Sequence, residues 1–206
     1  MNSRPASPRS QHQAPRLSDF RILVVPGLHG SGPGHWQSRW QRLYPAFERV
    51  EQEHWDQPDL PRWSQRLDER LQQSERPVVI VAHSFGCLTT VHCTARGHAD
   101  GAQNKIAAAL LVAPADPDKF QVASLVERAL PFPALVVGSS NDPWMTAPRA
   151  AHWAAVWGAD FLDAGALGHI NAESGLGDWA AGQSLLQQLL AGLPLEAGYP
   201  LDGVRR

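Results

Sequence analysis

The sequence predicts an α/β fold in which a doubly wound, mostly parallel sheet of six strands carries helices on both faces. Short apolar runs alternate along the chain with segments whose apolar residues recur at helical spacing. This alternation favours right-handed crossovers between parallel strands. The 206 residues, 43% of them hydrophobic, are enough for one domain with a substantial core, but they leave no room for a large lid domain.

Six segments have the apolar character, or the position between turns, that is expected of strands. They are residues 21–25, 49–54, 78–82, 106–113, 134–138 and 160–163. The second segment is more polar than most of the others, so we place it near an edge of the sheet.

Four segments between or after these strands repeat apolar residues at the spacing of one buried helix face. The residues concerned are Trp36, Trp40 and Leu43, then Trp63, Leu67 and Leu71, then Trp153 and Trp157, and finally Trp179, Leu186 and Leu190. We therefore expect most of the eight tryptophans to serve in packing.

The two ends of the chain differ in composition from its middle. Residues 1–18 are rich in Ser, Pro, Gln and Arg and contain no acidic residue, which is typical of a disordered tail. Residues 195–206 also have the character of an irregular tail. We therefore expect a single folded domain over residues 19–194, with no linker inside it.

Composition argues against several classes of partner. The formal net charge of −2 gives no electrostatic reason to expect nucleic acid, and no run of about 18 apolar residues could span a bilayer.

Cys87 and Cys93 are the only cysteines, and their spacing on one expected helix puts them on different faces, which disfavours a disulfide. We expect a cytoplasmic protein that acts on a small molecule or a short peptide, and its oligomeric state stays open.

Residues 78–86 are the most informative stretch, because an apolar strand runs directly into a small-residue turn centred on Ser84. A serine in such a nucleophile elbow occupies a strained turn between strand and helix, so the residues two before and two after it must be small. Here they are Ala82 and Gly86. Alanine replaces the usual first glycine, a change that adds only a methyl group.

An acid and a base follow Ser84 in the order that α/β-hydrolases require. Asp142 stands in a polar turn after the fifth expected strand, and His169 lies in a glycine-flanked loop before the last helix. We predict that Ser84, Asp142 and His169 form a catalytic triad. Asp116, which follows the fourth expected strand, is the rival acid.

Residues 26–36 form a glycine-rich loop after the first expected strand. The loop contains no Walker lysine and lacks the dinucleotide-binding spacing, so we do not expect it to hold a phosphate. Its glycines would instead let backbone N–H groups approach the oxygen of a reacting carbonyl. We predict that the N–H groups of Leu28 and Phe85 are the two donors of an oxyanion hole.

Side chains beside these loops are candidates for the substrate pocket. They are His29, His35, Trp36 and Trp144, and of these Trp36 and Trp144 are expected to wall an acyl or leaving-group pocket. For His35, local packing or hydrogen bonding is the interpretation that we favour. No pair of histidines has convincing metal-ligand spacing, so we expect no metal, and the chemistry needs no organic cofactor.

Taken together, these stretches resemble the small serine hydrolases of the YdeN and retinoblastoma-binding-protein type, a branch of the α/β-hydrolase superfamily. The resemblance spans nearly all of residues 20–192. It is carried by Pro26-Gly27, Gly30-Ser31-Gly32, His35-Trp36-Gln37, His83-Ser84-Phe85-Gly86, Ala113-Pro114-Ala115, Ser140-Asn141-Asp142-Pro143 and Gly168-His169-Ile170-Asn171 with Ser174-Gly175. It implies the same triad and a minimal hydrolase fold without a lid domain, but it does not define the substrate.

We therefore expect a serine hydrolase that cleaves a carboxylic ester or amide of a small soluble substrate through an acyl-enzyme on Ser84. Two alternatives stay open. An acyltransferase would form product faster when a nucleophilic acceptor is added, and a binding protein would carry a catalytically silent triad. The pocket-protein binding of the mammalian relatives is not expected, because the Leu-x-Cys-x-Glu motif is absent.

Overall fold

The computed structural model describes residues 15–96 and 105–193, and in these residues six strands form one sheet whose neighbours are all parallel. The strands are β1 (Arg21–Val25), β2 (Phe47–Arg49), β3 (Val78–His83), β4 (Ile106–Val112), β5 (Ala134–Gly138) and β6 (Asp160–Asp163). Their order in the sheet is β2-β1-β3-β4-β5-β6. The predicted parallel α/β sheet of six strands is confirmed.

The strand order reverses direction between β1 and β3. The chain first adds β2 outside β1, then returns to place β3 on the other side of β1 and continues outward to β6. Loops that leave the carboxyl ends of two strands at such a switch point diverge and leave a crevice, which is where open α/β sheets bind ligands. The glycine-rich loop after β1 and the serine turn after β3 are the two loops at this position.

The second strand is shorter and earlier than expected. We predicted residues 49–54, whereas β2 covers Phe47–Arg49. Phe47 is the buried residue that pairs with Ile22 of β1, and the parallel ladder continues only as far as the Val50 N–H, which donates to the Val24 carbonyl at 2.9 Å. The polarity of the segment had correctly indicated an edge strand, but it hid the apolar anchor at its start.

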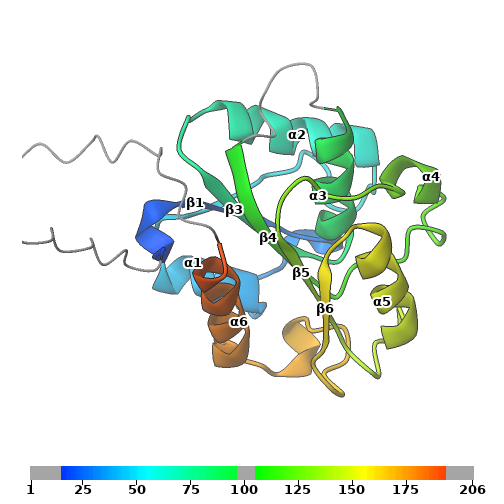
Figure 1. Cartoon of the computed structure of the whole chain (residues 1–206). Helices are drawn as coiled ribbons and strands as arrows, with labels where there is room; N and C mark the ends of the chain where they lie inside the picture. The colour runs from blue at the N-terminus through cyan, green and yellow to red at the C-terminus, as the bar shows by residue number, and fades with distance from the viewer. Residues whose placement is uncertain (1–14, 97–104, 194–206) are drawn as a thin grey trace, which may run out of the picture.

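Helices cover both faces of the sheet (Figure 1). One face carries α2 (Leu60–Gln72), α3 (Phe85–Arg96), α4 (Ala123–Val126) and α5 (Ala147–Val156), and the other carries α1 (Trp36–Leu43) and α6 (Ala180–Ala191). Short 3-10 turns lie at Leu17–Asp19 (η1), Leu28–Gly30 (η2) and Ala172–Ser174 (η4). Within the described residues no helix has both the length and the apolar content to cross a membrane.

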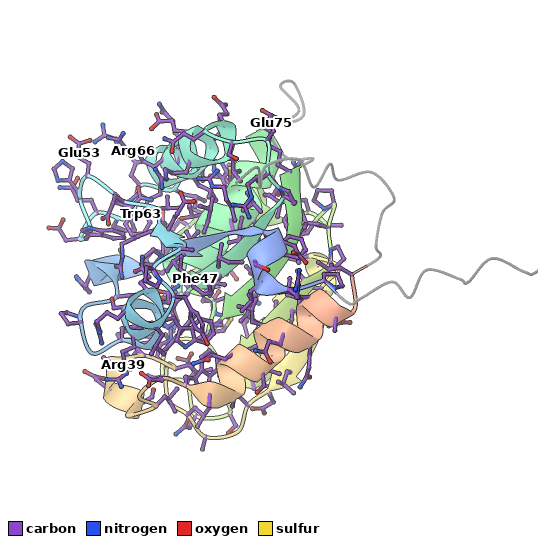
Figure 2. All side chains as sticks on the ribbon, turned by 90° about the vertical axis from the view of Figure 1, so that its left-hand side faces the viewer. Arg39, Phe47, Glu53, Trp63, Arg66 and Glu75 are labelled. Atoms are coloured by element: carbon purple, nitrogen blue, oxygen red, sulfur yellow. The ribbon has the colours of Figure 1, made fainter. Side chains whose placement is uncertain are left out.

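Each face has its own hydrophobic core, and the predicted helical tryptophans fill both. Figure 2 shows Trp63 below α2 on one side of the sheet and Phe47 near α1 on the other, and these two residues belong to different core clusters. Of the predicted core residues on helices, Leu43 is wrong: it is half exposed, because α1 ends there and turns its last apolar residue outward.

The N-terminal end of the described residues packs against the rest of the domain. Leu17 of η1 lies against the core cluster beside α1 and α6, although the sequence placed this residue in a tail. Residues 1–14 and 194–206, which make up most of the two predicted tails, lie outside the described residues.

Gly86 lets the start of α3 pass directly over the end of β1. A Cβ atom at this position would lie 2.2 Å from the Val25 carbonyl oxygen and 2.6 Å from the Pro26 carbonyl oxygen. Both obstacles are backbone atoms, so neither can rotate away. The small residue that the elbow pattern requires after the serine is thus required here by contact with β1.

We expect Gly86→Ala to lower the free energy of unfolding by about 3 kcal/mol, at the upper end of the usual cost of overpacking, because backbone must shift to admit the methyl group. Gly32→Ala is the matched control, since Gly32 is exposed and a Cβ there would meet nothing within 4 Å. Urea denaturation of both variants measures the effect. Equal midpoints for the two would contradict this account.

Candidate active site

Ser84 lies between β3 and α3 with a φ of 52°, in the left-handed region that non-glycine residues rarely occupy. Its N–H donates to the Val112 carbonyl of β4 at 3.0 Å, and its carbonyl accepts from the Cys87 N–H at 3.0 Å. These two bonds hold the strained turn from both sides. Ser84 is only partly buried, so its hydroxyl stands at the carboxyl edge of the sheet.

The three predicted triad residues form one chain of hydrogen bonds. The Ser84 Oγ lies 3.0 Å from His169 Nε2, and His169 Nδ1 lies 2.8 Å from Asp142 Oδ2. A carboxylate only accepts, so Nδ1 carries the proton of the neutral imidazole. Nε2 is therefore the unprotonated nitrogen, and it faces the serine hydroxyl as a general base must.

Asp142 is fixed through both of its carboxylate oxygens. Oδ2 contacts His169, while Oδ1 accepts the N–H of Trp144 at 2.8 Å and that of Met145 at 3.4 Å. The side chain is 2% exposed. The rival acid Asp116 is engaged elsewhere, because its carboxylate pairs with Arg149 at 3.4 Å and caps the Asp118 N–H at 3.1 Å. The structure thus places Asp142, and not Asp116, beside the histidine.

The predicted oxyanion donors lie at the starts of two neighbouring helices. Leu28 is the first residue of η2 and Phe85 is the first residue of α3, where backbone N–H groups have no intrahelical acceptor. The two segments touch: a Cβ atom on Gly27 would lie 2.7 Å from Ser84 Cβ and 3.3 Å from Phe85 N. Glycine at position 27 is what allows this approach.

Comparisons with known proteins identify the family of the chain. A sequence profile of serine hydrolases matches residues 22–188 of the chain. The chain belongs to the serine hydrolase family. A solved structure described as a YdeN-like hydrolase from Pectobacterium atrosepticum is similar at 37% identity and a TM-score of 0.79, over 86% of this chain and 94% of that one. No curated protein matches the chain.

Other solved structures share the fold at low identity. The ydeN gene product of B. subtilis aligns over 82% of this chain and 98% of its own, with 15% identity and a TM-score of 0.64. Est1E from Butyrivibrio proteoclasticus, solved with ferulic acid bound, aligns over 82% and 88%, with 12% identity and a TM-score of 0.60. This serine hydrolase therefore has the α/β-hydrolase fold, and no lid is evident in its described residues.

Two of the predicted pocket residues are instead part of the interior of this serine hydrolase. Trp36 is 1% exposed, and its indole Nε1–H donates to the Ile170 carbonyl at 2.8 Å. His35 is 4% exposed and caps α1, with Nδ1 accepting the Gln37 N–H at 3.1 Å. A role in the pocket is therefore wrong for Trp36, whereas the local packing that we favour for His35 is confirmed. The first turn of α1 points under the loop of His169 (residues 164–171), which we call the histidine loop, and not into solvent.

The other two pocket candidates are accessible. Trp144 is 59% exposed and follows the triad acid by two residues. Its carbonyl accepts from Lys119 Nζ at 2.7 Å. This bond joins the loop of Asp142 (residues 139–146), which we call the acid loop, to the segment before α4. His29 is exposed on η2 with a φ of 65°, next to the predicted donor Leu28. These two side chains stand on different loops at the carboxyl edge of the sheet.

A buried pair of histidines flanks the catalytic histidine candidate. His83 Nε2 donates to the His169 carbonyl at 2.9 Å, and the two rings lie 4.9 Å apart. The ring of His35 lies 4.6 Å from that of His83. Burial holds the pKa of His83 well below its usual value, with further contributions from His35 and His169. His35 and His83 therefore remain neutral packing groups and do not compete for the proton that His169 must carry.

Sequence reasoning missed the side chains that hold the glycine-rich loop. Gln37 is fully buried; its Nε2 donates to the Val25 carbonyl at 3.4 Å and the Val81 carbonyl at 3.0 Å, and its Oε1 accepts from Ser31 Oγ at 2.7 Å. The Arg49 guanidinium donates to the Gly30 carbonyl. A glutamine within the motif that carried the resemblance was the one available signal.

No metal centre accompanies the triad within the described residues, where no three His, Cys, Asp or Glu side chains gather in a metal-binding arrangement. The hydroxyl of Ser84, both ring nitrogens of His169 and both carboxylate oxygens of Asp142 are engaged in hydrogen bonds. The geometry can support proton transfer between Ser84 and His169, with Asp142 orienting the imidazole.

The buried state of His35 predicts a pH dependence of folding. Burial, followed by Arg49 and His169, lowers the pKa of His35 to about 3, whereas the unfolded residue titrates near 6.5. The unfolded state therefore binds more protons below about pH 6.5, and stability falls as the pH falls from there toward 3. Each pH unit in this window costs about 1.4 kcal/mol.

We expect His35→Asn, which keeps a capping acceptor, to lose about 2–3 kcal/mol less than the wild type between pH 6.5 and 4.5. Urea unfolding across this range measures the slope. His152→Asn, at an exposed histidine of α5, is the control and should match the wild-type slope. A His35→Asn slope that matched the wild type would show that His35 is protonated in the fold.

Proposed function

We propose that this serine hydrolase cleaves a carboxylic ester or amide through an acyl-enzyme on Ser84. The observation that carries the proposal is the unbroken hydrogen-bond chain from Ser84 Oγ through His169 to Asp142, at 3.0 and 2.8 Å. A serine hydroxyl is a weak nucleophile until an adjacent base removes its proton, and this chain supplies the base in the required tautomer.

In the first half of the reaction, His169 Nε2 takes the hydroxyl proton as Ser84 Oγ forms a bond to the substrate carbonyl carbon. The π electrons of the carbonyl move onto its oxygen. Asp142 holds the imidazole in place and stabilises the imidazolium. The bond to the leaving alcohol or amine then breaks as Nε2 returns the proton to it, which leaves the acyl group on Ser84.

In the second half, water replaces the leaving group and His169 takes a proton from it. The water oxygen bonds to the acyl carbon, the bond to Ser84 Oγ breaks, and the proton returns to the serine as the carboxylic acid departs. The N–H groups of Leu28 and Phe85 would stabilise the negative oxygen in both halves, and one such donor typically contributes a factor of about 100 or more.

The substrate we propose is a small soluble ester, amide or short peptide, handled without a cofactor, a nucleic acid or a membrane. Two features support it. The exposed Trp144 offers an apolar surface beside the triad acid, and no lid is evident in the described part of the chain to enclose a long substrate. A cytoplasmic location fits such a substrate and stays part of the proposal.

We expect a fluorophosphonate probe to label the wild type at a ratio of one per chain, as read by intact mass, and to leave Ser84→Ala unlabelled. Asp142→Asn should reduce the labelling rate by about 10³–10⁴, because the imidazole loses the partner that fixes its tautomer. Labelling should fall on acidification, since a protonated imidazole cannot accept the serine proton.

Asp116→Asn is the matched control for the acid, because Asp116 pairs with Arg149 and not with His169. It should label at the wild-type rate. If the folded wild type takes up no probe, the hydrolase proposal fails and a binding role gains weight. If product from an activated ester forms faster with an added acceptor amine or alcohol, acyl transfer is the better description.

Trp144 provides a test of the substrate pocket. We expect Trp144→Ala to lower kcat/KM for an ester with a bulky acyl group about tenfold relative to the acetate, because a large apolar contact is lost on one substrate only. Leu43→Ala removes an exposed apolar side chain at the far end of α1 and should not change the ratio. An unchanged ratio in Trp144→Ala would place the acyl pocket elsewhere.

A further inference from the structure

Two side chains of the acid loop hold the backbone of the histidine loop. Asn141 Oδ1 accepts the Gly168 N–H at 2.7 Å, and Ser139 Oγ accepts the Leu167 N–H at 2.9 Å. The Ser139 hydroxyl in turn donates to Asn141 Oδ1 at 3.0 Å. We call Ser139 and Asn141 the loop clasp. The two bonds reach Leu167 and Gly168, the residues immediately before His169, and they come from the residues one and three positions before Asp142.

The histidine loop needs restraint because of the backbone next to His169. Gly168 has a φ of 60°, which glycine adopts readily, but Ile170 has a φ of 45°, which a β-branched residue rarely adopts. Such a conformation persists only where surrounding contacts over-determine it. The loop has no strand partner here, so it is restrained by side-chain bonds together with the turn bond from the Ile170 N–H to the Leu167 carbonyl at 3.2 Å.

The clasp differs in kind from the other anchors of this loop. His83 donates to the His169 carbonyl and Trp36 to the Ile170 carbonyl, and both of these side chains are buried in the core. Asn141 is exposed and belongs to neither core cluster, so its removal leaves the packing of the domain in place. Asn141 joins the acid loop to the histidine loop.

We propose that Asn141, supported by Ser139, is a positioning residue that sets the distance between Asp142 and His169. The inference deepens the proposed function and rests on it. Proton transfer from Ser84 needs His169 aligned within a fraction of an ångström, and a displacement of about 1 Å can cost about a hundredfold in rate. A clasp between the two loops transmits the position of the carboxylate directly to the backbone that carries the imidazole.

Asn141→Ala tests the proposal. We expect a 10- to 100-fold lower rate of fluorophosphonate labelling and a similar fall in kcat for an activated ester, with KM within about twofold of the wild type. The thermal midpoint should stay within a few degrees, because the side chain is exposed. Ser139→Ala should have a smaller effect in the same direction.

Asn141→Asp is the conservative rescue. Its carboxylate still accepts the Gly168 N–H, so labelling at high pH should recover to within a few-fold of the wild type. The added negative charge near His169 favours the imidazolium, so the acid limb of the pH profile should move to higher pH. The shift of the limb reports the added charge, whereas recovery of the rate shows that a hydrogen-bond acceptor at position 141 is what positions His169.

Ser140→Ala is the matched control. Ser140 lies between the two clasp residues and is exposed, and within the described residues its N–H, not its hydroxyl, makes the contact to the Gly165 carbonyl. It should label at the wild-type rate. An equal loss in Ser140→Ala and Asn141→Ala would overturn the proposal, because general softening of the acid loop would then explain both.

Amide hydrogen exchange separates failure of the clasp from failure of the proposed function. In the wild type, exchange at Gly168 should be slow, and Asn141→Ala should accelerate it at least tenfold whether or not the protein reacts with the probe. Unchanged exchange would show that the bond does not restrain the loop and overturn the proposal. Faster exchange with an unchanged labelling rate and pH profile would also overturn it, because the clasp would then be structural only.

Discussion

The close approach of the first turn of α3 to the end of β1 is the constraint on which the site depends. A Cβ on Gly86 would collide with the Val25 and Pro26 carbonyls, and a Cβ on Gly27 would collide with the Cβ of Ser84. This contact forces Ser84 into its left-handed turn and brings the glycine-rich loop beside it. The positions of Ser84, the proposed nucleophile, and of the proposed oxyanion donors therefore both follow from the packing of these two segments at the β1/β3 switch point.

The histidine loop is positioned in a different way, by side chains that come from the other three parts of the site. His83 adjoins Ser84, Trp36 follows the glycine-rich loop, and Asn141 adjoins Asp142; each makes one hydrogen bond to the backbone of residues 168–170. A loop outside any sheet ladder gains a defined position only through such bonds. Residues of the other site motifs therefore also hold the backbone around His169, which explains why the motifs extend beyond the triad itself.

The sequence predicted the features that depend on neighbouring residues and missed those that depend on contacts between distant segments. Strands of continuous apolar residues and the elbow around Ser84 follow from neighbours along the chain, as do the polar turn of Asp142 and the glycine-flanked His169. Trp36 is buried against a loop more than 130 residues away and His35 against the ring of His83, and no periodicity records such contacts. The start of β2 was missed because one apolar residue, Phe47, anchors an otherwise polar segment.

Burial also divides the residues around the site into two groups. Gln37, His83 and Asp142 are buried. Gln37 and Asp142 each bond to more than one segment of the site, and His83 bonds to the backbone of His169, so a change at any of them disturbs the alignment of the site. Trp144 and His29 are exposed; the Trp144 backbone N–H donates to Asp142, and the His29 backbone N–H donates to the Trp55 carbonyl. If these two positions line the proposed pocket, substitutions there would change substrate preference and leave the hydrogen-bond chain of Ser84, His169 and Asp142 intact.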